Sequence, residues 1–208
     1  MAEILKLEKA IEEIRKDKER KFNQSVDLII NLKDFDIKKT QINTFVALPH
    51  KIKDKRICGF IETKTNVIDT ISKKEFPTFK NKKDIKVLVG KYDFFISSAQ
   101  NMPAVATTFG RVLGPAGKMP SPKMGILMQE SPEEIKSIVE KVSKSIRLQT
   151  KEPSIKVIIG KVSMKDSEIM DNINAVYRTL LNELPKGKEN IRSLMIKLTM
   201  SHPIKFEI

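Results

Sequence analysis

The sequence of 208 residues contains no tryptophan, one cysteine and two histidines. One cysteine cannot form a disulfide within the chain, so nothing in the sequence demands an oxidising compartment. Cys58, His50 and His202 also lack the spacing of metal ligands and fall short of the roughly four that a structural zinc site uses. These shortages exclude a disulfide framework and a closed zinc site, and we expect no metal or other cofactor.

Long apolar stretches are absent as well. No run of the sequence approaches the roughly 20 apolar residues that a membrane-spanning helix needs. Residues 1–4 lead directly into charged residues, without the apolar core of a signal peptide. With 40% hydrophobic and 31% charged residues, the chain has enough apolar material for an ordinary globular core. We therefore expect a cytoplasmic globular protein without a membrane partner.

Negative charge is in short supply, because 39 Lys and Arg face 26 Asp and Glu and leave a formal charge of +13. Such a surplus attracts polyanions, of which nucleic acid is the commonest in the cytoplasm. Charge alone does not distinguish DNA, RNA and acidic membranes, and an AT-rich genome also produces an excess of lysine. A generic basic protein that binds any polyanion is therefore an alternative.

The two ends of the chain share one style of patterning. Apolar residues at helical spacing predict helices over 3–21 and 166–184, and the segment 185–187 with its proline and glycine ends the second one. Alternating apolar residues predict strands over 22–32, 41–48, 145–150, 155–159 and 194–199. We therefore expect both ends to form one discontinuous α+β domain.

The middle of the chain alternates between the two kinds of element. Its patterns predict strands over 57–63, 85–90 and 94–97, and helices over 66–74, 103–112 and 131–142. The last of these helices begins with a capping box in which Ser131 is the N-cap residue and Glu134 the partner. This alternation predicts a small parallel or mixed sheet with helices on its faces, inserted after the basic connector 51–56.

Residues 109–125 contain three prolines and four glycines, which predicts a loop without regular structure. Gly117 and Lys118 resemble the end of a phosphate-binding loop. However, a Walker A motif needs a glycine where this chain has Val112, and a serine or threonine where it has Met119. The spacing therefore favours a structural loop over nucleotide hydrolysis.

Two enzyme alternatives stay open at this point. One is a phosphate- or nucleotide-binding enzyme that uses the loop Gly114–Lys118, and the other is a catalytic pair of Cys58 with a histidine brought close by the fold. No carboxylate stands in an apolar setting that would identify it as a general acid or base. We therefore expect a protein that is not an enzyme.

Residues 21–27 join the basic end of the first helix to the first long strand. In one interpretation Phe22 anchors the core, while Ser25 and Asp27 face solvent. In the other, Lys21, the ring and the short polar side chains contact phosphates and 2′-hydroxyls across an RNA minor groove. Ser193 and residues 197–201 join this surface only if the last strand lies beside the first.

At these residues the chain resembles the ribosomal protein L-one family, the universal stalk protein of the large ribosomal subunit, in its archaeal form. The resemblance covers essentially all 208 residues. The proline- and glycine-rich run is the most specific part, and the other matching segments follow in the family's order. The matching segments are residues 22–28, 31–33, 48–50, 113–120, 122–123, 159–161 and 197–200.

The resemblance implies an α/β protein of two domains. Residues 1–51 and 144–208 would form an RNA-binding α+β domain, and residues 52–143 an inserted Rossmann-like domain of three α/β layers. It also implies a monomer within the large subunit that binds the mobile ribosomal RNA stalk near the exit site and assists release of deacylated tRNA. Repression of translation from its own mRNA is a further implied function, found in some members.

The resemblance also implies which residues contact RNA. They are Lys21, Phe22, Ser25, Asp27, Ser193, Thr199, Met200 and Ser201, with Arg147 and Lys151 beside the return crossing. This chain has Lys51 and Ser201 where the family usually has glycine, which implies a stiffer hinge at Lys51. At Ser201 a side chain would hinder close approach of the backbone to RNA, while its hydroxyl can donate a replacement hydrogen bond.

Overall fold

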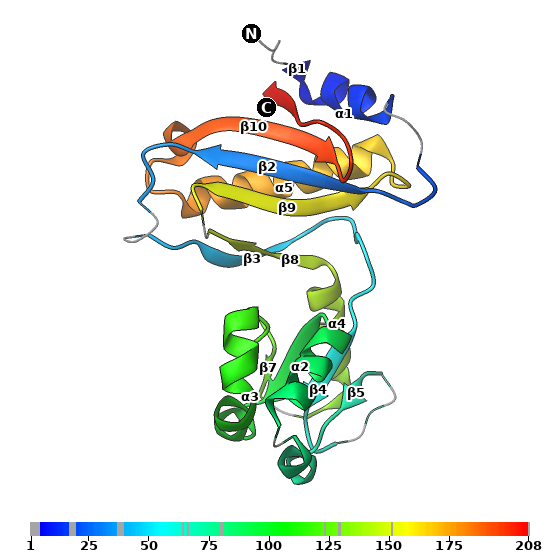
Figure 1. Ribbon diagram of the computed structural model, residues 1–208, viewed down its shortest axis with the longest axis vertical. Coiled ribbons are helices and arrows are strands. Elements are labelled where there is room, and N and C mark those ends of the chain that lie inside the picture. Colours follow the sequence, from blue (N-terminus) through cyan, green and yellow to red (C-terminus); the bar gives the residue numbers. More distant parts are fainter. Residues whose placement is uncertain are drawn as a thin grey trace. The chain divides into compact units, whose positions relative to one another are not determined.

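The computed structural model describes residues 5–16, 20–36, 40–63, 65, 67–79, 81–122, 124–128, 130–150 and 152–207. The chain folds into two compact units, residues 1–52 with 144–208 and residues 53–143 (Figure 1). Both units combine sheets with helices, so the mixed α/β class expected from the sequence is confirmed. The chain leaves the first unit once and returns to it once.

A five-stranded sheet forms the centre of the first unit, in the order β1-β11-β10-β2-β9 (Figure 1). Strand β10 pairs antiparallel with both β2 and β11, β2 pairs antiparallel with β9, and β1 runs parallel to β11. The strands are β1 (Leu5–Lys6), β2 (Ser25–Leu32), β9 (Ser154–Lys161), β10 (Ile191–Leu198) and β11 (Ile204–Glu207). The two central strands therefore come from opposite ends of the chain.

The core of this unit lies under one face of the sheet. Because side chains of a strand alternate between faces, every second residue of β2 is buried, from Val26 to Leu32. Helices α1 (Leu7–Arg15) and α5 (Asp166–Glu183) belong to the same buried cluster as these residues. The expected inner face of α5 is confirmed and consists of Ile169, Ile173, Val176, Leu180 and, just beyond the helix, Leu184.

A second, two-stranded sheet of β3 (Asn43–Ala47) and β8 (Ser145–Gln149) carries the chain out of the first unit and back. The segment that leaves it is fixed by Asn172 of α5, whose side chain is fully buried. Its Oδ1 accepts from the backbone N–H of His50 at 3.1 Å, and its Nδ2 donates to the carbonyls of His50 and Ile159 at 3.2 and 2.9 Å. One side chain therefore ties the outgoing segment to both the helix and the sheet.

The second unit is a parallel sheet in the order β5-β4-β6-β7 with helices on both faces. Neighbouring residues of β4 enter different cores: Cys58 and Phe60 pack with α2 and α3, while Ile57 packs with α4. The two cores on opposite sides of one sheet make this unit a three-layer α/β structure. Its elements are β4 (Ile57–Phe60), β5 (Asp69–Thr70), η1 (Lys73–Thr78), α2 (Lys82–Lys91), β6 (Phe94–Ser98), α3 (Met102–Ala116), β7 (Ile126–Leu127) and α4 (Pro132–Ser143).

Three predictions in this unit are wrong. Residues 85–90 lie in helix α2, because Ile85 and Val89 share its buried side while Val87 is exposed. Residues 66–74, expected to be helical, contain β5 and the start of η1 in their described part. Residues 109–116 belong to α3 and not to a loop, since Pro115 is tolerated in the last turn and Gly117 ends the helix at a left-handed φ of 69°.

Smaller differences concern element ends. Strand β2 begins at Ser25 and not at residue 22, α1 covers only part of the expected 3–21, and β1, β11 and η2 (Gly187–Asn190) were not expected. Residues 3–4 and 17–19 of the first predicted helix lie outside the described residues. The N-cap prediction for α4 is confirmed, because Ser131 Oγ accepts from the backbone N–H of Glu134 at 3.3 Å.

We predict that Phe109→Ala destabilises the second unit by about 3–5 kcal/mol, because it leaves a cavity in the core. The side chain is fully buried, and its ring lies 4.9 Å from that of Phe60 and 5.2 Å from that of Phe76. Urea unfolding followed by circular dichroism measures the loss. Phe109→Leu keeps most of the apolar volume and is the matched control; equal stability of the two variants would contradict this account of the core.

Candidate nucleic-acid interface

The side of the five-stranded sheet opposite the core carries polar, cationic and apolar side chains of β10, β2 and the edge strand β9. In register, Asp27 lies beside Lys197, and Asn31 beside Ser193. Strand β9 continues the surface on the other edge of β2. We call this surface the open sheet face; it consists of Ser25, Asp27, Ile29, Asn31, Ser154, Lys156, Ile158, Ser193, Met195 and Lys197. None of these residues belongs to the buried core.

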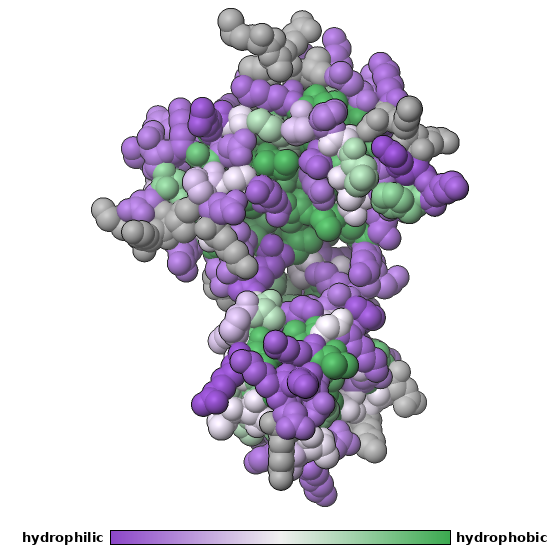
Figure 2. Space-filling view, viewed as in Figure 1, coloured by the Kyte–Doolittle hydropathy of each residue, from purple (hydrophilic) through white to green (hydrophobic). Residues whose placement is uncertain are grey.

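Figure 2 shows hydrophobic residues in the middle of the first unit and hydrophilic residues around them. The apolar members of the open sheet face are Ile29, Met195 and Ile158, and the last of these is 48% exposed. Lysines 156 and 197 flank them on the neighbouring strands. The face can therefore offer apolar contact and phosphate-binding cations to the same ligand.

The two ends of the chain meet where β2 begins and β10 ends. The backbone N–H of Ser25 donates to Thr199 Oγ1 at 3.1 Å across 174 residues of sequence, and the N–H of Thr199 donates to the Ser25 carbonyl at 3.1 Å. Next to them, the N–H of Met200 donates to Gln24 Oε1 at 3.2 Å. Strand β10 therefore lies beside β2, as the proposed joining of Ser193 and residues 197–201 to the surface of residues 21–27 requires.

Two large apolar side chains at this junction are exposed: Phe22 by 54% and Met200 by 61%. The interpretation of Phe22 as a core anchor is therefore wrong. Lys21 beside it is also exposed. An aromatic ring next to a cation on the surface is suited to contact with a nucleobase, because every base offers a face for stacking.

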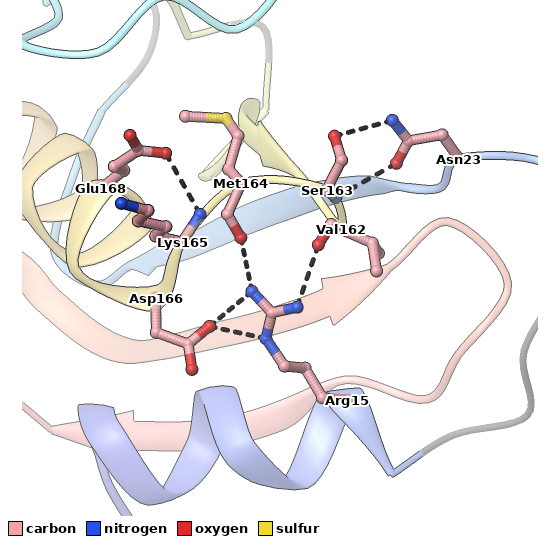
Figure 3. A network of polar contacts seen from close by, with 8 residues as sticks. All are labelled: Arg15, Asn23, Val162, Ser163, Met164, Lys165, Asp166 and Glu168. Atoms are coloured by element: carbon pink, nitrogen blue, oxygen red, sulfur yellow. Dashed lines mark hydrogen bonds and ion pairs between the residues drawn. The ribbon is translucent and has the colours of Figure 1, made fainter.

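A network of polar contacts fixes the segment that carries Phe22 (Figure 3). Asn23 Nδ2 donates to Ser163 Oγ at 2.9 Å, and the N–H of Ser163 donates back to Asn23 Oδ1 at 3.3 Å. On the preceding side, Arg15 donates to Asp166 Oδ1 at 2.6 Å. Arg15 also donates to the carbonyls of Val162 and Met164. Arg15, at the end of α1, and Asn23, next to Phe22, are thus each held against the turn between β9 and α5.

Asp27 is the acidic residue of the open sheet face and lies beside Lys197. Partial burial raises the pKa of its carboxyl group above the ordinary value, while the cation of Lys197 opposes this shift. Its ionised form therefore costs stability in the folded chain. A carboxylate only accepts hydrogen bonds, so this group suits a donor such as a 2′-hydroxyl or a base amine.

The far end of the open sheet face contains a hollow of about 500 Å³. In its wall, Asn31 Nδ2 donates to Ser193 Oγ at 2.9 Å. Arg192, Lys205 and Asn31 were not predicted as contact residues from the sequence, although alternation from Asp27 places Asn31 on the same face. The lining residues are Asn31, Leu32, Pro153, Arg192, Ser193, Met195 and Lys205.

Three of the candidate residues are placed differently from the rest. Ser201 Oγ accepts from the N–H of Leu198 at 2.8 Å and so closes the turn after β10. Arg147 lies on β8, outside the open sheet face, where its Nε donates to Asn43 at 2.8 Å and its guanidinium lies 5.9 Å from the centre of the Phe45 ring. Lys151 lies outside the described residues.

The geometry contradicts both enzyme alternatives. Lys118 Nζ donates to the carbonyls of Val89 and Tyr92 at 2.7 and 2.8 Å, so the amine caps the end of α2 and is not directed at a phosphate site. Burial raises the pKa of the Cys58 thiol to about 12, which removes the thiolate nucleophile at neutral pH.

Among the described residues no group of three or more His, Cys, Asp or Glu is placed to hold a metal ion. In the same part of the chain, no helix combines the length and apolar character needed to cross a membrane.

The two units and the open sheet face define a mixed α/β protein with a discontinuous, lysine-bearing unit and an inserted parallel α/β unit. Residues 14–202 match the Ribosomal protein L1p/L10e family. The chain is 34% identical over 215 residues to the large ribosomal subunit protein uL1 of Pyrococcus horikoshii, covering 97% of this chain and 95% of that protein. Proteins of the same name from Methanothermococcus thermolithotrophicus and Cenarchaeum symbiosum are 34% and 30% identical, covering 96% and 99% of this chain and 96% and 97% of theirs.

The chain therefore belongs to the ribosomal protein L1 family, with archaeal relatives, as the resemblance implied. It is a structural ribosomal protein of the cytoplasm and not an enzyme.

We predict that Asp27→Asn raises the free energy of unfolding at pH 7 and weakens binding of stalk RNA. The raised pKa of the folded state means that ionised Asp27 destabilises the fold. The gain should be present at pH 7 and vanish as the pH falls below the ordinary value of about 3.9. Urea unfolding at pH 7 and pH 3, with filter binding at fixed salt, checks both parts.

Glu183→Gln removes the same charge from an exposed position of α5 and is the control for this experiment. A gain of the same size in both variants, or one that persists at pH 3, would show that burial of Asp27 is not its cause. If Asp27→Asn binds RNA as tightly as the parent chain, the carboxylate of Asp27 does not contact the RNA.

Proposed function

We propose that the chain binds the mobile ribosomal RNA stalk near the exit site through the open sheet face and the junction beside it. The observation that carries this proposal is the pairing of Ser25 with Thr199, which gathers polar groups from both chain ends on an uncovered sheet surface in a ribosomal protein. Its proposed contact residues are Lys21, Phe22, Ser25, Asp27, Ser193, Thr199, Met200 and Ser201, with Arg147 and Lys151 as outlying candidates.

Affinity and fit would come from different groups. Lys21, Lys156 and Lys197 are placed to neutralise phosphates, which supplies sequence-independent affinity that weakens as salt rises. Phe22 and the short polar side chains are suited to one RNA shape, because the wide minor groove of A-form RNA displays 2′-hydroxyls and base edges. A gently twisted sheet can lie against such a shallow groove more closely than a convex helix can.

The finer consequences of this proposal concern two further RNAs. A protein that holds the stalk near the exit site would assist release of deacylated tRNA. A surface that recognises RNA by shape also binds any messenger that folds into the same shape, so repression of the protein's own mRNA requires no second site. Within the large subunit the chain would act as a monomer.

The rival function is generic attraction to polyanions, favoured only by the net charge of +13. It predicts equal affinity for stalk RNA and for an unrelated duplex, with both falling steeply in salt. Competition between the two RNAs for the protein, measured at about 0.05 M and about 0.2 M salt, separates the hypotheses. A stalk-specific protein keeps a preference that salt does not abolish.

We predict that Phe22→Ala weakens stalk RNA binding by about 1–3 kcal/mol, the usual contribution of one aromatic stack on a base. Because the ring is more than half exposed, the fold should lose little stability. Filter binding with a parallel urea titration measures both quantities. Phe22→Tyr retains the aromatic face and should bind nearly as well as the parent. Stacking would be contradicted if Phe22→Ala kept its affinity for RNA, or if Phe22→Tyr lost affinity while Phe22→Ala did not.

We predict that removal of the inserted unit leaves stalk RNA binding within about threefold, less than the roughly 1.4 kcal/mol that a tenfold change represents. Ile52 packs against the core of the first unit and should be kept, so the deletion covers residues 53–143. Leu48 and Lys144 are joined by a backbone hydrogen bond of 2.7 Å, so a short Gly-Ser linker can connect Ile52 to Lys144. A shortened protein that shows native circular dichroism but no binding would place the RNA site in the other unit.

A further inference from the structure

The outer side of helix α2, in the second unit, carries a group of lysines that the proposed function does not use. Ile85 and Val89 face the core, so the opposite side of the helix faces solvent. Its exposed residues are Lys82, Lys83, Asp84, Lys86, Val87, Gly90 and Lys91. We call this surface the basic α2 face.

The charge of this face is not neutralised locally. In the described part of the chain, Lys82, Lys83 and Lys86 form no ion pair, and Asp84 is the only acidic residue of the helix. At its end, Lys91 borders a hollow of about 470 Å³ whose wall also contains Lys55, Arg56 and Asp69, and Arg56 is paired with Asp93. The excess of positive charge therefore lies on the helix itself.

Two further features suit close approach of a ligand. Val87 is 73% exposed in the middle of the lysines, where it offers apolar contact without being needed by the core. A side chain added at Gly90 would meet no atom within 4 Å, so packing within the unit gives no reason for glycine there. Glycine weakens a helix, but it lets another backbone come close.

We infer that the basic α2 face is a second RNA-binding surface, which contacts the sugar-phosphate backbone of an RNA element other than the one on the open sheet face. Charge complementarity supports this occupant, and RNA is the polyanion that surrounds a ribosomal protein. Lysine acts as a point charge without the planar fork of arginine, so this surface binds phosphates without reading sequence. The inference concerns the second unit and does not depend on the contacts proposed for the first.

The test uses the full chain and a fluorescent RNA duplex of about 16 base pairs that lacks the stalk sequence, a length typical for contacts across successive grooves. Duplex binding is measured by anisotropy over a range of salt, for the parent chain saturated with stalk RNA and for the Phe22→Ala chain without it. Stalk RNA binding is measured separately. Failure of stalk binding would therefore count against the proposed function alone.

The decisive variant is Lys83→Gln/Lys86→Gln, and its control is Lys136→Gln/Lys141→Gln. Both pairs are exposed on helices of the same unit, and α4 covers the other face of the sheet from α2. We expect the first variant to lose roughly tenfold in duplex affinity near 0.1 M salt and to lower the salt slope by about two. The control should stay within about twofold, and stalk RNA binding should be unchanged in both.

Gly90→Glu places a carboxylate in the middle of the face, and Gly90→Gln is its neutral counterpart. Because the added side chain meets open space, both should fold, and only the first should repel the duplex strongly. Equal losses in the two lysine pairs, no loss in either, or equal effects of the two Gly90 variants would overturn the inference. So would tighter binding to vesicles of anionic phospholipid than to the duplex.

Discussion

The antiparallel pairing of β2 with β10 is the constraint on which the rest of the structure depends. It joins the two ends of the chain side by side in one sheet, and the second unit, residues 53–143, is inserted in the sequence between them. The pairing also sets which side chains are buried, because a shift of one residue would exchange the two faces. With Leu28 beside Ile196 in the core, Asp27 and Lys197 necessarily share the outer face.

Elements with a strong pattern of their own could be predicted from the sequence. Strand β2 and helix α5 each bury one complete face, so their periods of 2 and 3.6 residues are plain in the sequence. Helix α2 misled the prediction because Ile85, Val87 and Val89 alternate as in a strand, although Val87 contacts solvent. Strands β1 and β11 are too short to carry a pattern and are defined by their partners.

The candidate site was harder to predict than the fold, for a physical reason. Composition favoured a buried Phe22, and only the family resemblance favoured an exposed one, which the structure has. Lys156 enters the surface through the pairing of β9 with β2, and pairing across more than a hundred residues leaves no local signal. Ser201 could be named from the sequence, but its contact with the N–H of Leu198 depends on the geometry of the turn.

The two surfaces differ in what they cost the fold, and this difference separates their proposed roles. Asp27 is ionised at partial burial and so reduces stability, while Phe22 keeps more than half of its surface in water and gains little from folding. The lysines of the basic α2 face are solvated and cost almost nothing. A costly, shaped surface can distinguish one RNA from another, whereas a solvated one contributes affinity that any phosphate backbone satisfies. Under the two proposals, selectivity belongs to the unit built from the chain ends, and the inserted unit adds affinity for a separate RNA element without changing which stalk RNA is chosen.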